Sequence, residues 1–141
     1  MRRFRFRLDP LLRLRSQLER ASRRELARAT AALHEVDQQL VAAAHGRREF
    51  SEAAARGGLG ETLASALAAG LSRHEFQLLT RQRQMAAQLE TVRADYVQKK
   101  RELGALEQWR EREHEEWRVD SQRTEQAELD ELAQLIREGK K

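Results

Sequence analysis

The spacing of apolar residues between Leu26 and Ala43 most constrains what this chain can fold into. Intervals of three and four residues alternate there, through Leu26, Ala29, Leu33, Val36, Leu40 and Ala43. This is the heptad seam of a coiled-coil helix. Upstream, the seam is expected to continue through Leu11, Leu14, Leu18 and Ser22, with a stutter of two four-residue intervals that locally unwinds the supercoil.

A second seam follows later in the chain. Its positions are Leu78, Met85, Leu89, Val92, Tyr96, Leu103, Leu106 and Trp117. Charged residues make up 35% of the chain and Pro10 is its one proline, a composition typical of long helices. Disorder is the competing interpretation at this charge content, and the regular leucine spacing argues against it.

Helix signals predict an all-α fold in which two long helices form an antiparallel coiled-coil hairpin, the second longer than the first. We expect one domain over residues 1–141. Residues 2–8 are an extended or frayed lead-in, and Asp9 and Pro10 start a helix over about 10–55. Three glycines mark a turn, Gly70 interrupts a short segment within 56–72, and Ser72 caps a helix over about 73–138.

Such a hairpin, with residue 55 opposite residue 73, places Leu33 near Asp95 and Tyr96, and Leu12 near Glu116 and Trp117. Residues 120–141 then have no partner within the chain. Their apolar side chains, at Leu129, Leu132, Leu135 and Ile136, are expected to make an intermolecular contact, or else the segment is a frayed tail. Gly104, inside the second helix, leaves room for close approach of another backbone.

Charge is distributed unevenly. Residues 1–28 hold ten arginines against Asp9, Glu19 and Glu25, a net charge of +7, so the rest of the chain carries −3 of the total +4. A basic end favours an acidic partner surface. An arginine-rich solvated face is the alternative.

No pattern indicates catalysis, and we expect no enzyme activity, no cofactor, no metal and no small-molecule substrate. The four histidines are never three or four residues apart, as helical zinc sites require. No phosphate-binding loop or cysteine is present. No apolar run approaches the roughly 20 residues of a membrane span, so a cytoplasmic protein is expected.

The few aromatic residues are candidates for contacts, because a rod two helices thick cannot bury them fully. Tyr96 lies on the seam and is expected to pack, whereas Trp109 lies off it and is a possible exposed hot spot. Phe50 and Phe76 flank the turn. They either cap it jointly or form an exposed patch there.

The opening residues Phe4-Arg-Phe-Arg-Leu8-Asp-Pro-Leu11-Leu12-Arg-Leu14-Arg15 closely resemble the start of the FliJ family of bacterial flagellar export proteins. Lys99-Lys100-Arg101-Glu102-Leu103 is similar to that family's basic stretch before its spaced leucines. The resemblance covers nearly the whole chain in length, helix order and turn position.

This resemblance implies a stalk within the ring of the hexameric flagellar export ATPase, peripheral to the inner face of the cell membrane. It also implies contacts with the cytoplasmic domain of the export gate protein and with export chaperones. The ring contacts would come from the termini, at Arg2, Arg3, Arg5, Arg7, Arg13, Arg15, Leu129, Leu132 and Ile136. The gate contacts would be Gln39, Leu40, Phe50 and Phe76, although Ala43 and Gly46 stand where relatives carry larger side chains.

Two other functions compete. The equivalent stalk protein of an injectisome would share this pattern. A nucleic-acid-binding protein would use the basic arm to neutralise phosphates, but the helices alternate in charge sign and lack a continuous basic stripe. No nucleic-acid partner is therefore expected.

Overall fold

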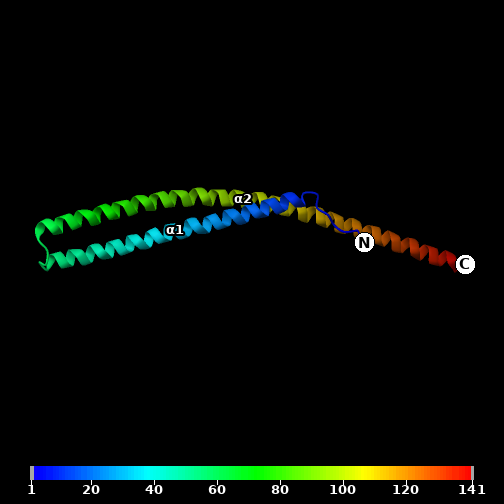
Figure 1. The fold of residues 1–141 in the computed structure, drawn as a ribbon. Coiled ribbons are helices and arrows are strands. Elements are labelled where there is room, and N and C mark those ends of the chain that lie inside the picture. Colours follow the sequence, from blue (N-terminus) through cyan, green and yellow to red (C-terminus); the bar gives the residue numbers. More distant parts are fainter. Residues whose placement is uncertain (1, 141) are drawn as a thin grey trace. The chain divides into compact units, whose positions relative to one another are not determined.

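The computed structural model describes residues 2–140, and in this part of the chain two helices account for the regular structure. Helix α1 spans Asp9–Ala55 and helix α2 spans Glu61–Gly139. The helices lie side by side and run in opposite directions (Figure 1). The predicted all-α hairpin with a longer second helix is therefore confirmed.

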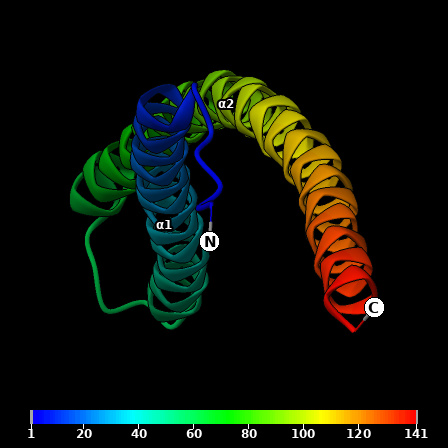
Figure 2. The ribbon, with the colours of Figure 1, turned by 90° about the vertical axis from the view of Figure 1, so that its right-hand side faces the viewer.

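The ends of α1 follow from local backbone chemistry. The Asp9 N–H donates to the carbonyl of Phe6 at 3.1 Å, and the Asp9 carboxylate pairs with Arg13 at 3.1 Å. At the other end Gly57 adopts a φ of 80°, and its N–H donates to the carbonyl of Ala54 at 3.1 Å. This left-handed residue turns the chain out of the helix, into the short connection that Figure 2 shows between α1 and α2.

Helix α2 begins at Glu61, so the start predicted near residue 73 is wrong. Gly70 does not interrupt it. One glycine costs about 1 kcal/mol relative to alanine, and the alanines and leucines around it are helix formers. Ser72, predicted to cap the helix, lies inside it, and Glu75 three residues later accepts a hydrogen bond from Arg47 of α1 at 3.1 Å.

The chain divides into two compact units. Unit 2 is Arg20–Val97, and polar pairs there define how α1 and α2 face each other. Ser22 Oγ donates to Asp95 at 3.1 Å, and Gln82 Nε2 donates to Asp37 at 2.6 Å. Ser22, not Leu33, therefore faces Asp95. The predicted register is wrong because it was built on the wrong start of α2.

Burial shows which residues make the seam. Val36, Leu78 and Leu89 are buried in unit 2. On α1 the covered positions keep alternating intervals of three and four back to Leu12, without the predicted stutter: Leu12, Arg15, Glu19, Ser22, Leu26, Ala29 and Leu33 are all buried or half-buried. Leu11, Leu14 and Leu18 lie beside the seam and are exposed.

Two further findings bear on the helices. A Cβ atom added at Gly104 would meet nothing within 4 Å, so no described part of this chain approaches the Gly104 backbone closely. Over residues 2–140, neither helix is long and apolar enough to cross a membrane.

Candidate interaction surfaces

Unit 1 consists of Met1–Glu19 with Gln98–Lys141, and its centre is an ion pair across the two helices. Arg15 donates to Glu102, which also accepts a hydrogen bond from Gln98 at 3.2 Å. The two charges are half-buried and satisfy each other. Arg15, expected to meet a partner ring, is therefore engaged within the chain.

The N-terminal arm, residues 2–8, packs against α2. The Phe4 ring lies edge-on to His114 at 4.9 Å between centroids and tilted against Trp117 at 5.8 Å. The Arg110 guanidinium sits 5.7 Å from the centre of the Phe4 ring, in cation–π range. Phe6 is buried. Phe4, rather than Leu12 as predicted, is therefore the neighbour of Trp117.

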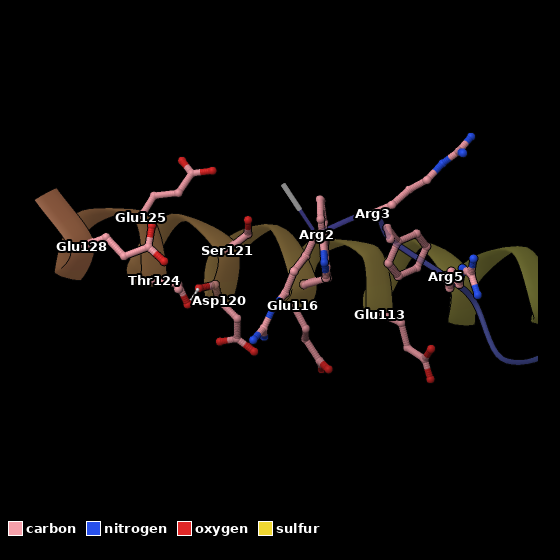
Figure 3. A pocket seen from close by; sticks show the side chains of 12 residues that line it. Arg2, Arg3, Arg5, Glu113, Glu116, Asp120, Ser121, Thr124, Glu125 and Glu128 are labelled. Atoms are coloured by element: carbon pink, nitrogen blue, oxygen red, sulfur yellow. Dashed lines mark hydrogen bonds between the residues drawn. The ribbon is translucent and has the colours of Figure 1, made fainter.

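The arm borders an open hollow of about 810 Å³. Three arginines of the arm, Arg2, Arg3 and Arg5, line this hollow (Figure 3). The α2 residues Glu113, Glu116 and Asp120 line it too. This juxtaposition of opposite charges favours the arm's position on the helix. The arm still presents basic side chains outward, because Arg2, Arg3, Arg5 and Arg7 are exposed, as is Arg13 at the start of α1.

The nearby surface of α2 carries its own ion pair. Arg118 donates to Glu115 through Nε at 2.9 Å and Nη2 at 2.5 Å. This hydrogen bonding lowers the pKa of Glu115 and raises the pKa of Arg118. Because both groups are solvated, the pair contributes little to stability.

Beyond residue 121, the described part of the chain covers α2 only slightly. Every residue from 122 to 140 is exposed. Large apolar side chains there, Leu129, Leu132, Leu135 and Ile136, have between 55% and 63% of their surface exposed. Trp109, nearer the arm, is 41% exposed. Several large apolar side chains exposed close together on one helix mark a surface that a partner can cover.

In unit 2 the predicted gate residues differ in how far they are exposed. Gln39 is exposed and lines an open hollow of about 820 Å³ between α1 and α2, with Leu71 and His74 on the opposite side. Leu40 and Phe50 are half-buried. Phe76 is 70% exposed, so Phe50 and Phe76 do not cap the turn as a shared buried pair.

Sequence reasoning missed the exposed leucines on α1. The spacing of Leu11, Leu14 and Leu18 predicts that they belong to the seam. The signal that separates the two assignments is the heptad phase of Leu26. Counting back in sevens leads to Glu19 and Leu12 on the covered side, which leaves Leu11 and Leu18 beside it.

The surfaces are long helical faces with charged and apolar contacts, and the described residues contain no group of three or more His, Asp or Glu side chains that could hold a metal ion. The sequence model of one protein family, described as flagellar FliJ protein, matches residues 4–140. The chain belongs to the FliJ family. Comparison with curated proteins and with solved structures found no match.

Membership of the FliJ family makes this chain a coiled-coil protein of the flagellar export system. The match begins at the phenylalanine that packs on Trp117 and includes the uncovered end of α2. The predicted resemblance to the family is therefore confirmed over nearly the whole chain.

Proposed function

We propose that this FliJ-family chain is a non-catalytic stalk for the hexameric flagellar export ATPase, coupling it to the cytoplasmic domain of the export gate protein and to export chaperones. It would work in the cytoplasm, at the inner face of the cell membrane. The observation that carries the proposal is the combination, within unit 1, of exposed arginines on the arm and uncovered leucines on α2.

The ring contact is assigned to these two groups. The arm supplies Arg2, Arg3, Arg5 and Arg7, and the start of α1 supplies Arg13. Such cations suit the acidic lining of a channel. Leu129, Leu132 and Ile136 add apolar surface, which gives affinity where charge gives orientation. Arg15 supports the stalk from inside through Glu102.

The gate contact is assigned to unit 2. Gln39 beside its hollow and the exposed Phe76 are the accessible members of the expected set. Leu40 and Phe50 would support this surface from their half-buried positions. Trp109 in unit 1 is a further candidate contact for a chaperone or the ring, because aromatic side chains dominate binding hot spots.

Nucleic-acid binding is not supported. The arm's arginines lie along a stretch of α2 that contains Glu113, Glu116 and Asp120. Carboxylates beside these arginines would repel phosphates.

The test is a titration of the cognate export ATPase with the chain. The chain alone should hydrolyse no ATP, and its addition should raise hydrolysis by the ATPase. Leu129→Ser with Ile136→Ser should require about tenfold more chain for half-maximal stimulation, the effect of losing about 1.4 kcal/mol of contact energy.

Leu63→Ser with Leu67→Ser is the matched control, because both are exposed leucines of α2 that lie in unit 2. It should leave the titration unchanged. No change in hydrolysis at saturating wild-type chain would refute the stalk proposal. Equal effects of the two sets of substitutions would remove the ring contact from the end of α2.

A further inference from the structure

Unit 1 carries two uncovered apolar stripes with the same spacing. On α1, Leu11, Leu14 and Leu18 are 37%, 50% and 36% exposed. On α2, Leu129, Leu132 and Ile136 are 60%, 55% and 61% exposed. In both stripes an interval of three residues is followed by one of four, so each presents its side chains along one helix face.

The chain cannot cover one stripe with the other. Arg15, next to Leu14, pairs with Glu102, which places the first stripe beside that part of α2. Leu132 lies 30 residues further along the same continuous helix, about 45 Å away at 1.5 Å per residue. Covering both stripes therefore requires another molecule.

We propose that a second copy of this chain covers them. In a two-fold dimer, the stripe at the end of α2 in each copy lies on the α1 stripe of the other. The contact then occurs twice, as in isologous dimers generally. This inference goes beyond the proposed function and does not depend on it.

The direction of the helices supports this pairing. A two-fold axis across the ends makes the two α2 helices antiparallel. Since α1 is antiparallel to α2 within each copy, α1 of one copy runs parallel to α2 of the other. Leu11 then meets Leu129, Leu14 meets Leu132 and Leu18 meets Ile136. The intervals match in order, as in the layers of a parallel coiled coil.

Charge also supports it. Residues 2–20 contain seven arginines against Asp9 and Glu19, whereas residues 122–140 contain five acidic residues against Arg123, Arg137 and Lys140. The two segments therefore carry net charges of opposite sign, +5 and −2. Opposite charges attract as the stripes meet and disfavour the pairing of two identical segments.

The dimer should be weak and reversible. One contact between two leucine stripes buries less than the roughly 1,000 Å² of a specific interface. The two-fold arrangement supplies two such contacts. Leu129, Leu132 and Ile136 are also the residues assigned to the ATPase ring. A chain held in the dimer could not use them for the ring, so the two states would exclude each other.

Cysteine cross-linking of the full-length chain tests the pairing, and the absence of native cysteine leaves no background. Leu14→Cys and Leu132→Cys chains, made separately and mixed, should form a disulfide-linked pair on mild oxidation, because facing layers bring the Cα atoms within the range that a disulfide spans. The matched control is a mixture of Leu63→Cys, an exposed position in unit 2, with Leu132→Cys. This mixture should cross-link about tenfold more slowly than Leu14→Cys with Leu132→Cys.

Sedimentation equilibrium gives a second readout. The wild-type chain should dimerise reversibly, and Leu132→Glu should weaken dimerisation at least about tenfold by placing a charge against leucine. Leu63→Glu should not weaken it. Circular dichroism should show unchanged helix content in both variants, since both leucines are exposed in the single chain.

Three results would overturn the proposal. The first is a chain that stays monomeric up to its highest soluble concentration. The second is equal cross-linking in the Leu14→Cys and Leu63→Cys mixtures. The third is linkage of Leu132→Cys to itself in preference to Leu14→Cys, which would show that two α2 ends pair with each other. None of these results bears on stimulation of the ATPase.

Discussion

At the scale of single residues, the polar members of the seam decide how the helices face each other. Leu11, Leu14 and Leu18 fit a seam by spacing, yet Arg15, Glu19 and Ser22 occupy the covered side. The reason lies on α2: Glu102 and Asp95 accept hydrogen bonds from Arg15 and Ser22. Polar groups that are satisfied in this way can occupy a coiled-coil interface.

Glycines at two kinds of position should respond oppositely to alanine. Gly104 lies inside α2 with free space for a Cβ, so Gly104→Ala should raise the free energy of unfolding by about 1 kcal/mol. Gly57 has a φ of 80°, which alanine adopts at a cost of about 1 kcal/mol or more. Urea unfolding followed by circular dichroism measures both changes. Destabilisation by Gly104→Ala would show that this glycine is needed for packing.

At the scale of elements, the sequence predicted the kind of structure better than its register. Heptad spacing and the lone Pro10 predicted α1 with nearly its observed bounds. The predicted start of α2 is wrong because a glycine such as Gly70 occurs both inside helices and at their ends, and the local sequence is alike in the two cases. Only contacts with α1, such as the one between Arg47 and Glu75, distinguish the two.

The packing of the arm on α2 could not be predicted from local patterns. Residues 2–8 alternate charged and apolar side chains, a pattern typical of a strand, but the described part of the chain has no sheet for a strand to join. Its contacts are with residues about a hundred positions away, including His114 and Trp117. The uncovered end of α2, by contrast, was predictable from helix lengths alone. The accessible gate residues were not, because exposure depends on the register.

The arm should detach when its buried aromatic is removed. Phe6→Ala should lower the stability of the arm's packing by about 2 kcal/mol, less than the 3–5 kcal/mol of a globular core because most residues of the arm are exposed. Tryptophan fluorescence should shift to longer wavelength as Trp117 gains water. Arg7→Ala, at an exposed arm position outside the hollow that Arg2, Arg3 and Arg5 line, is the control and should leave the emission unchanged. An unaltered spectrum in Phe6→Ala would mean that the arm does not depend on this side chain.

At the scale of the whole molecule, little apolar surface is removed from water. Over residues 2–140 the buried hydrophobic side chains are Phe6, Val36, Leu78 and Leu89. Stability must therefore come mainly from the half-buried residues along the seam, because a long helix alone is only marginally stable in water. A chain of this kind differs in its thermodynamics from a globular domain of equal length.

The heat-capacity change of unfolding should accordingly be small. A globular chain of 141 residues would show roughly 1.7–2.1 kcal/mol/K, and this chain should fall clearly below that range. Differential scanning calorimetry measures the value. Scans at several protein concentrations separate dissociation of a dimer from unfolding. A value within the globular range would indicate burial that the single chain does not provide.

The polar pairs of unit 2 also restrict how the chain can change in length during evolution. Ser22 with Asp95, Asp37 with Gln82, and Arg47 with Glu75 connect the two helices at three levels. One residue inserted between two levels of α1 would rotate everything beyond it by about 100° and break those pairs. We therefore expect relatives to differ within the paired stretch by blocks of seven residues, present in both helices at once. The connection at 56–60 is free of this rule and should vary residue by residue.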